Sequence, residues 1–176
     1  MDESRSDRPS LYDEDVVAWA EQQAAALRAL GARPELSNVL DWENIAEEVE
    51  SVGSSQVSAV ASTIRLVLVH LIKHLSAPHL PPAQHWRSEI VAFQLTGRAG
   101  YRASMRRKID LDRIWRDAVI QAEANLAAYH DAPVAGLPES SPFTLDELVA
   151  EDFDIDRSLI QLAASLDSTR PTRRRR

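Results

Sequence analysis

The sequence predicts an all-α protein, an up-and-down bundle of about five main helices with a short C-terminal helix. Apolar residues recur at helical spacing along most of its 176 residues. No segment alternates apolar and polar residues as a half-buried strand does, and seven of the nine prolines fall between the periodic segments. The length suits one helical domain over residues 11–167, between a disordered N-terminus (1–10) and a disordered basic tail (168–176).

Five main helices follow from apolar periodicity and from stop and start signals. Gly31 and Pro34 stop the first helix, Asp41 caps the second, and Gly53 with two serines ends it. Prolines after residue 77 end the third, and two glycines weaken the middle of the fourth without ending it. The expected ranges are 12–30, 41–53, 56–77, 84–108 and 112–129.

The third of these helices is expected to be the central element. It is apolar nearly all round between Leu66 and Ile72, which is typical of a helix surrounded by others, so Leu68 and Leu71 should be fully buried. Near the C-terminus, Thr144 and Glu147 have the spacing of a capping box that opens a short helix.

Composition favours a soluble, cytoplasmic protein. There is no cysteine, the N-terminus is too acidic for a signal peptide, and the run Ile64–Ile72 is too short to span a bilayer, so we expect no membrane association. Charge alternates in blocks, with −9 over residues 1–56, +6 over 57–117, −9 over 118–167 and +5 over the last nine. Such blocks favour contacts between helices of opposite sign, within one chain or between copies.

The candidate chemical site combines Glu48 with two histidines four residues apart, His70 and His74. Two imidazoles one turn apart and a carboxylate from an adjacent helix are a metal-ligand or acid/base pattern. However, the H-E-x-x-H and Glu-x-x-His spacings are absent, and Lys73 in the same turn would repel a cation. We therefore predict a hydrogen bond or ion pair between Glu48 and His70 that raises the pKa of His70, with no metal and no cofactor.

A second candidate is an anion-binding stripe. Arg98, Arg102 and Arg106 follow one another at helical spacing, and the C-terminal arginines could assist them. With a pI near 5.2, nucleic-acid binding through these residues is only an alternative, and we expect no tight complex. Phosphate loops and nucleophile elbows are absent from the sequence.

The stretches "LDWENIAEEVESVG", "LVLVHLIKHL" and "SPFTLDEL" resemble a bacterial family known as domain of unknown function 29, over residues 12–153. The resemblance implies a small helical protein and no assigned activity. The chain departs from the family pattern in a longer first loop, in His74 where an aromatic residue is common, and in its arginine tail.

Three classes of function remain after this reading, one of which is the weak nucleic-acid binder that would use Arg98, Arg102, Arg106 and the C-terminal arginines. We favour a non-enzymatic protein-interaction or scaffold module, acting on a protein partner or as a homo-oligomer, because no chemical motif outweighs its structural explanation. The other alternative is a metal-dependent or acid/base enzyme that uses Glu48, His70 and His74.

Overall fold

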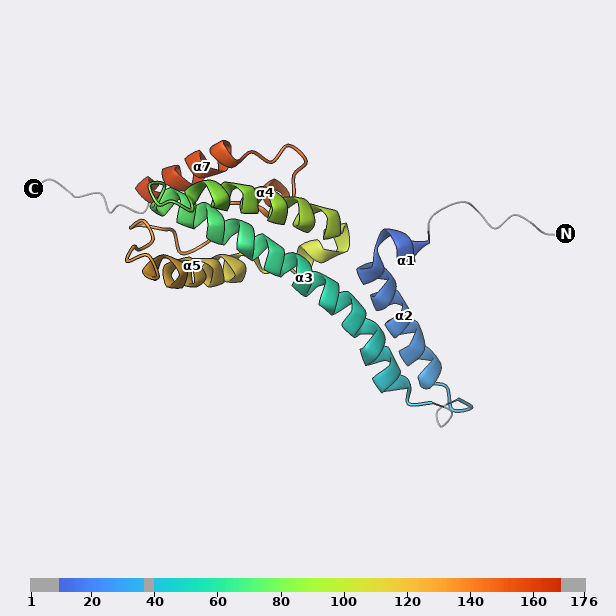
Figure 1. Ribbon diagram of the computed structural model, residues 1–176. Helices are drawn as coiled ribbons and strands as arrows, with labels where there is room; N and C mark the ends of the chain where they lie inside the picture. The colour runs from blue at the N-terminus through green and yellow to red at the C-terminus, as the bar shows by residue number, and fades with distance from the viewer. Residues whose placement is uncertain (1–9, 37–39, 169–176) are drawn as a thin grey trace, which may run out of the picture. The chain divides into compact units, whose positions relative to one another are not determined.

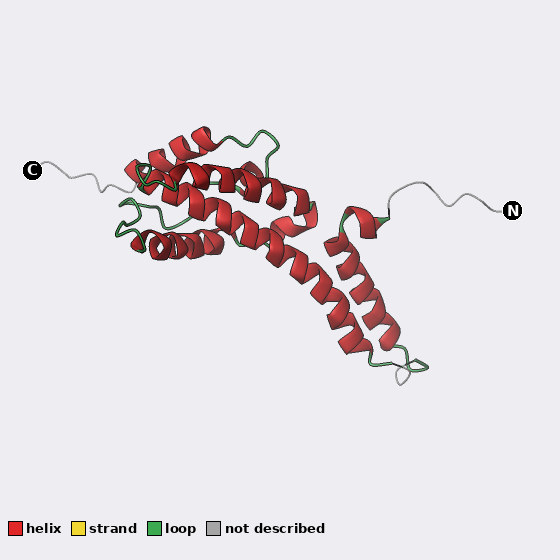
Figure 2. Ribbon diagram, in the orientation of Figure 1, coloured by secondary structure: helices red, strands yellow, loops and turns green. Residues whose placement is uncertain are grey.

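A computed structural model describes residues 10–36 and 40–168. The described chain consists of helices joined by loops (Figure 2), which confirms the all-α prediction. The α-helices are α1 (Leu11–Glu14), α2 (Val16–Gly31), α3 (Trp42–Ser76), α4 (Ala83–Gly100), α5 (Leu111–Ala127), α6 (Leu145–Leu148) and α7 (Ile155–Ser168), and a 3₁₀ helix, η1 (Ala103–Arg107), follows α4.

The chain divides into two compact units. The described residues of the first unit are 10–36, 40–58 and 102–108, and those of the second are 59–101 and 109–168. Helix α3 contributes its first half to one unit and its second half to the other. The single domain expected over residues 11–167 stays a prediction, and the expected disordered ends lie almost wholly outside the described residues.

The most consequential correction concerns α3. The predicted break at Gly53 is wrong, because one helix of 35 residues replaces the two expected helices. Gly53 is buried against α2, and a Cβ added there would lie 3.4 Å from the Cβ of Ala20. A Cβ would therefore fit there, and the helix tolerates the glycine at a cost of about 1 kcal/mol relative to alanine.

Other boundaries also differ from the prediction. The first expected helix is divided at Asp15, whose carboxylate accepts hydrogen bonds from the Ala18 N–H at 3.0 Å and the Ser104 hydroxyl at 2.7 Å. The fourth helix ends at Gly100, because the chain leaves it at Tyr101 in an extended conformation. The cap at Asp41, where the Asn44 N–H donates at 3.3 Å, and the capping box of α6 are both present as predicted.

In the second unit, α3 is the central helix, with α4, α5 and α7 around it (Figure 1). Leu68 and Leu71 are completely buried, as predicted. Trp115 of α5 is also buried, and its indole N–H donates to the Pro138 carbonyl at 2.8 Å. The core residues in the second half of α3 are Val60, Ile64, Val67, Leu68, Val69, Leu71 and Ile72.

By length and composition, α3 could also cross a membrane, and it is the one such helix among the described residues. The central helix of a soluble core has the same composition, and the burial of Leu68, Leu71 and their neighbours in the second unit is typical of such a helix.

Candidate functional sites

The structure does not bring Glu48 and His70 together. Both lie on α3, twenty-two residues apart, so they are separated by about 33 Å along the helix axis. The predicted pairing depended on two helices folding back on each other, and it is wrong because α3 is continuous. His74 does not join them either, since its electrostatic neighbours are Arg87 and Asp156.

His70 instead pairs with Glu89 of α4. Its Nε2 lies 2.9 Å from Oε2 of Glu89, and its Nδ1 lies 2.8 Å from the Leu66 carbonyl oxygen one turn earlier. The Phe93 ring packs beside the imidazole, with 5.5 Å between the ring centroids. Both ring nitrogens face acceptor oxygens, and a neutral imidazole has only one N–H to donate, so both contacts are hydrogen bonds only when the pair holds one further proton. The His70 side chain is 8% exposed, so a substrate has little access to it.

Lys73 belongs to the same buried cluster. The residue is 7% exposed, and its ammonium lies over the Trp86 ring at 4.6 Å from the centroid, a cation–π contact. Burial lowers the pKa of Lys73, although the Glu89 carboxylate raises it in part. Glu89 is therefore the carboxylate that interacts with both buried basic side chains, His70 and Lys73.

The expected rise in the pKa of His70 is wrong. Burial lowers the pKa of His70, and nearby Lys73 lowers it further, which together outweigh the contacts with Leu66 and Glu89. Burial also lowers the pKa of His74, and the positive charge of Arg87 lowers it further. The Nδ1 atom of His74 is buried without a hydrogen-bond partner among the described residues.

These side chains do not form a metal centre. Within residues 10–36 and 40–168, no group of three or more His, Asp or Glu side chains is placed to hold a metal ion. His70 faces Glu89 and His74 lies near Arg87, so the two imidazoles have different partners. The cluster is best described as a set of buried polar contacts between α3 and α4.

The arginine stripe is also absent, because α4 ends before its second member. Arg98 lies in α4, and its guanidinium donates to the Glu151 carbonyl at 3.4 Å. Arg102 lies outside the helix and donates to the Glu14 carbonyl at 2.8 Å, while Arg106 belongs to η1. These residues do not share one helical face, so the geometric basis for the anion site is lost.

The first unit contains a helical hairpin, formed by α2 and the first half of α3 (residues 42–58), which lie side by side in Figure 1. Arg28 of α2 joins the two helices, donating to Glu50 at 2.6 Å and to Glu43 at 2.9 Å. The Glu50 contact and then the Glu43 contact raise the pKa of Arg28. Two of the four glutamates between residues 41 and 53 are thus structural partners of one arginine.

The hairpin buries small side chains and leaves larger ones partly exposed. Its buried residues are Val17, Ala20, Ala24, Ala46 and Gly53. Next to this contact lies an apolar groove, lined by Trp19 of α2 and by Asn44, Ile45, Glu48, Val49 and Val52 of α3. Tyr12 of α1 packs edge-on against Trp19 at 4.8 Å between centroids and remains half exposed. An apolar surface of this kind is typical of a site that binds another molecule.

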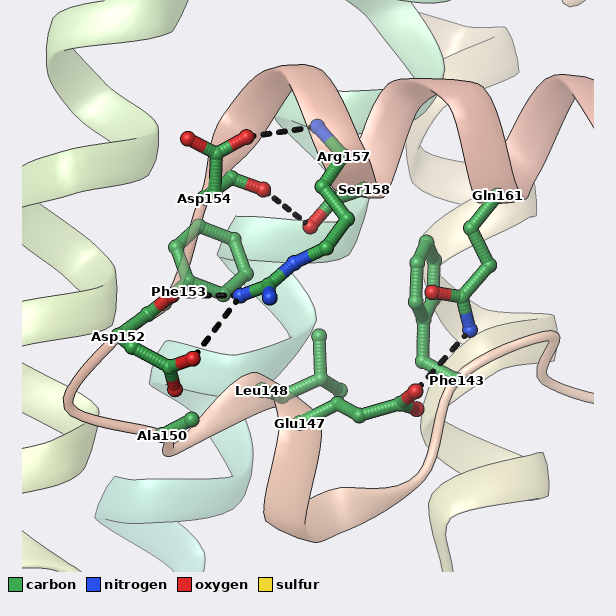
Figure 3. A pocket seen from close by; sticks show the side chains of 10 residues that line it. All are labelled: Phe143, Glu147, Leu148, Ala150, Asp152, Phe153, Asp154, Arg157, Ser158 and Gln161. Carbon is green, nitrogen blue, oxygen red and sulfur yellow. Dashed lines mark hydrogen bonds and ion pairs between the residues drawn. The ribbon is translucent and has the colours of Figure 1, made fainter.

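A smaller pocket of about 220 Å³ lies between α6 and α7 in the second unit (Figure 3). Its polar side chains bond mainly to one another and to the local backbone. Arg157 donates to the Asp152 carbonyl at 2.6 Å, and Gln161 donates to the Glu147 carboxylate at 3.4 Å. The backbone N–H of Thr144 lowers the pKa of Glu147, as expected for a capping carboxylate. These contacts explain the pocket as part of the turn that joins the two helices.

Comparison with known proteins identifies a family and a similar crystal structure. The family described as "Domain of unknown function DUF29" matches residues 11–154. The chain belongs to this family. A crystal structure of an α-helical protein of unknown function from Rhodospirillum rubrum is 38% identical, with a TM-score of 0.78, and the match covers 88% of this chain and 99% of that one. None of the curated proteins matches this sequence.

The family match bears on the three sites differently. The apolar groove and the His70–Glu89 contact lie wholly inside the matched residues of DUF29, whereas Arg157 and Gln161 of the smaller pocket lie beyond them. The resemblance stated from the sequence is confirmed, and it assigns no activity.

Sequence reasoning missed Glu89, although a signal was present. Glu89 lies four residues before Phe93 on a predicted helix, so the two share a face, and Phe93 is a large apolar residue of the kind that such a face buries. The groove was missed for another reason. A break at Gly53 would let the second expected helix fold back on the third and cover Ile45, Val49 and Val52, but the third helix is the continuation of the second.

Proposed function

We propose that this DUF29 protein is a non-enzymatic interaction module that binds a helix of a partner protein in the apolar groove. The observation that carries the proposal is that the hairpin buries small side chains and leaves large apolar ones partly exposed. Ala20, Ala24 and Ala46 are buried, whereas Trp19 and Val49 are only partly covered and Val52 is 42% exposed. Helices normally bury their large apolar side chains, so a further partner would complete this packing.

The spacing of the groove residues favours a helix as the occupant. Along α3, the groove residues Ile45, Val49 and Val52 recur at intervals of four and three residues. This is the spacing of a coiled-coil seam, into which the side chains of another helix insert. A third helix against α2 and α3 would use the helix-in-groove mode of recognition.

An interaction module has better support than an enzyme or a nucleic-acid binder. Glu48 and His70 do not meet, the His70 side chain is almost buried, and the three arginines do not share a helical face.

A site-specific photo-cross-linking experiment tests this proposal. A photoreactive residue replaces Val52 in the groove or, as a control, Val91 on α4, an exposed helical valine of the same kind (42% and 46% exposed). We expect a discrete adduct with one protein from position 52 in cells and none from position 91, and Val49→Asp should remove it because it places a charge in the groove. Equal adduct patterns at the two positions would refute the proposal.

A further inference from the structure

We infer that the partner helix is basic, with an apolar stripe flanked by lysine or arginine side chains; this inference rests on the proposed function. The charge of the hairpin and of the residues that flank it supports it. Residues 10–36 and 40–58 contain ten acidic and two basic side chains, a net charge of −8. Residues 102–108 add four bases, and the described part of the first unit still has a net charge of −4.

The charges next to the groove have the same sign. Glu48 is an exposed side chain that lines the groove, and no basic residue lines it. Two basic residues of the unit are paired away from the groove: Arg28 pairs with Glu43 and Glu50, and Lys108 pairs with Glu21. Lys108 also lines a separate pocket of this unit, with Val17 and Gly53. A helix bound in the groove would therefore meet uncompensated negative charge, which favours a basic partner and repels an acidic one.

Charge or composition argues against three other occupants. A second copy would bring two acidic hairpins together, at a cost from like-charge repulsion. The chain's own C-terminal segment, "STRPTRRRR", has the right charge but lacks the large apolar side chains that would fill the groove. Anionic lipid surfaces would repel the hairpin for the same electrostatic reason.

Three synthetic helical peptides of about five turns test the inference on the full-length chain. The first has leucines at intervals of three and four residues and lysines elsewhere. The second has glutamates in place of the lysines, and the third keeps the lysines but has alanines in place of the leucines. We expect the first to bind at least about tenfold more tightly than either of the others, as measured by fluorescence anisotropy at physiological ionic strength.

Two matched pairs of variants locate the binding. Val52→Asp should abolish binding of the basic leucine peptide, whereas Val91→Asp on α4 should leave it unchanged. Glu48→Lys should weaken that peptide and strengthen the acidic one, whereas Glu47→Lys makes the same change of net charge on a residue that does not line the groove. Equal effects of the two lysine variants would show that net charge alone attracts the peptide, and would overturn the inference.

The other outcomes separate this inference from the proposed function. If the basic and acidic leucine peptides bind equally and both are lost in Val52→Asp, the groove is a docking site but its partner is not selected by charge. A dimer that is lost in Val52→Asp would identify a second copy as the occupant, and co-sedimentation with phosphatidylcholine vesicles that is lost in the same variant would identify a lipid surface. Either result would overturn the inference. If neither leucine peptide binds and position 52 gives no specific adduct, both proposals fail.

Discussion

Gly53→Ala tests the continuity of α3. A continuous helix predicts that the free energy of unfolding rises, whereas a helix that ends at Gly53 predicts that it falls. In the structure Gly53 is an interior helical residue, and alanine is favoured over glycine there by about 0.8–1 kcal/mol. An added Cβ would lie 3.4 Å from the Ala20 Cβ and 3.5 Å from the Val17 Cα, both ordinary van der Waals distances. We therefore expect the free energy of unfolding to rise by about 0.5–1 kcal/mol.

The assay is urea unfolding followed by far-UV circular dichroism, with the slope of the transition checked for constancy. Gly136→Ala is the control, because the backbone of Gly136 has φ 86° and alanine there should cost roughly 1–2 kcal/mol. Ser55→Pro is the complementary variant. In the middle of a continuous helix it should cost about 3 kcal/mol or more, whereas at a helix start proline would be tolerated. If Gly53→Ala destabilises the protein and Ser55→Pro does not, α3 ends at Gly53 and the reasoning is refuted.

Three further results follow from the second unit. Leu71→Ala should cost roughly 2–5 kcal/mol, because Leu71 is completely buried, whereas Ile160→Ala on the surface of α7 should change stability little; equal effects in urea unfolding would contradict the central position of α3. The lowered pKa of His70 means that the imidazole binds a proton more readily in the unfolded chain than in the folded one. Stability should therefore fall as pH is lowered through about 6.5, the ordinary pKa of histidine, toward the folded pKa. His70→Gln should flatten that part of a plot of melting temperature against pH. His74, near Arg87 and Asp156, contributes with the same sign; stability that rises from pH 7 to 5.5 would show that the Glu89 contact outweighs burial and Lys73. A chelator should leave the melting temperature unchanged, because Glu48, His70 and His74 do not converge; a loss of stability that zinc restores would contradict this.

Local interactions explain which parts of the fold could be predicted. The Asp41 cap and the Thr144–Glu147 capping box depend on residues three apart, and both are present. The apolar run around Leu68 predicted a buried helix, and burial follows from composition alone. The wrong boundary at Gly53 has an equally clear cause, since a glycine between helical segments ends a helix in one context and is tolerated inside a helix in another.

The sequence by itself determined that the protein is helical, where the core helix lies and that its charge is distributed in blocks, because these properties depend on residues close together along the chain. Only the tertiary structure decided that His70 meets Glu89 and not Glu48, and that Trp19 and Val52 stay partly exposed while Ala20 and Ala46 are buried. Those outcomes depend on which helix faces which. Which helices face each other is decided by the packing of segments far apart in the sequence. Because α3 continues through Gly53, Glu48, His70 and His74 all have neighbours other than those predicted.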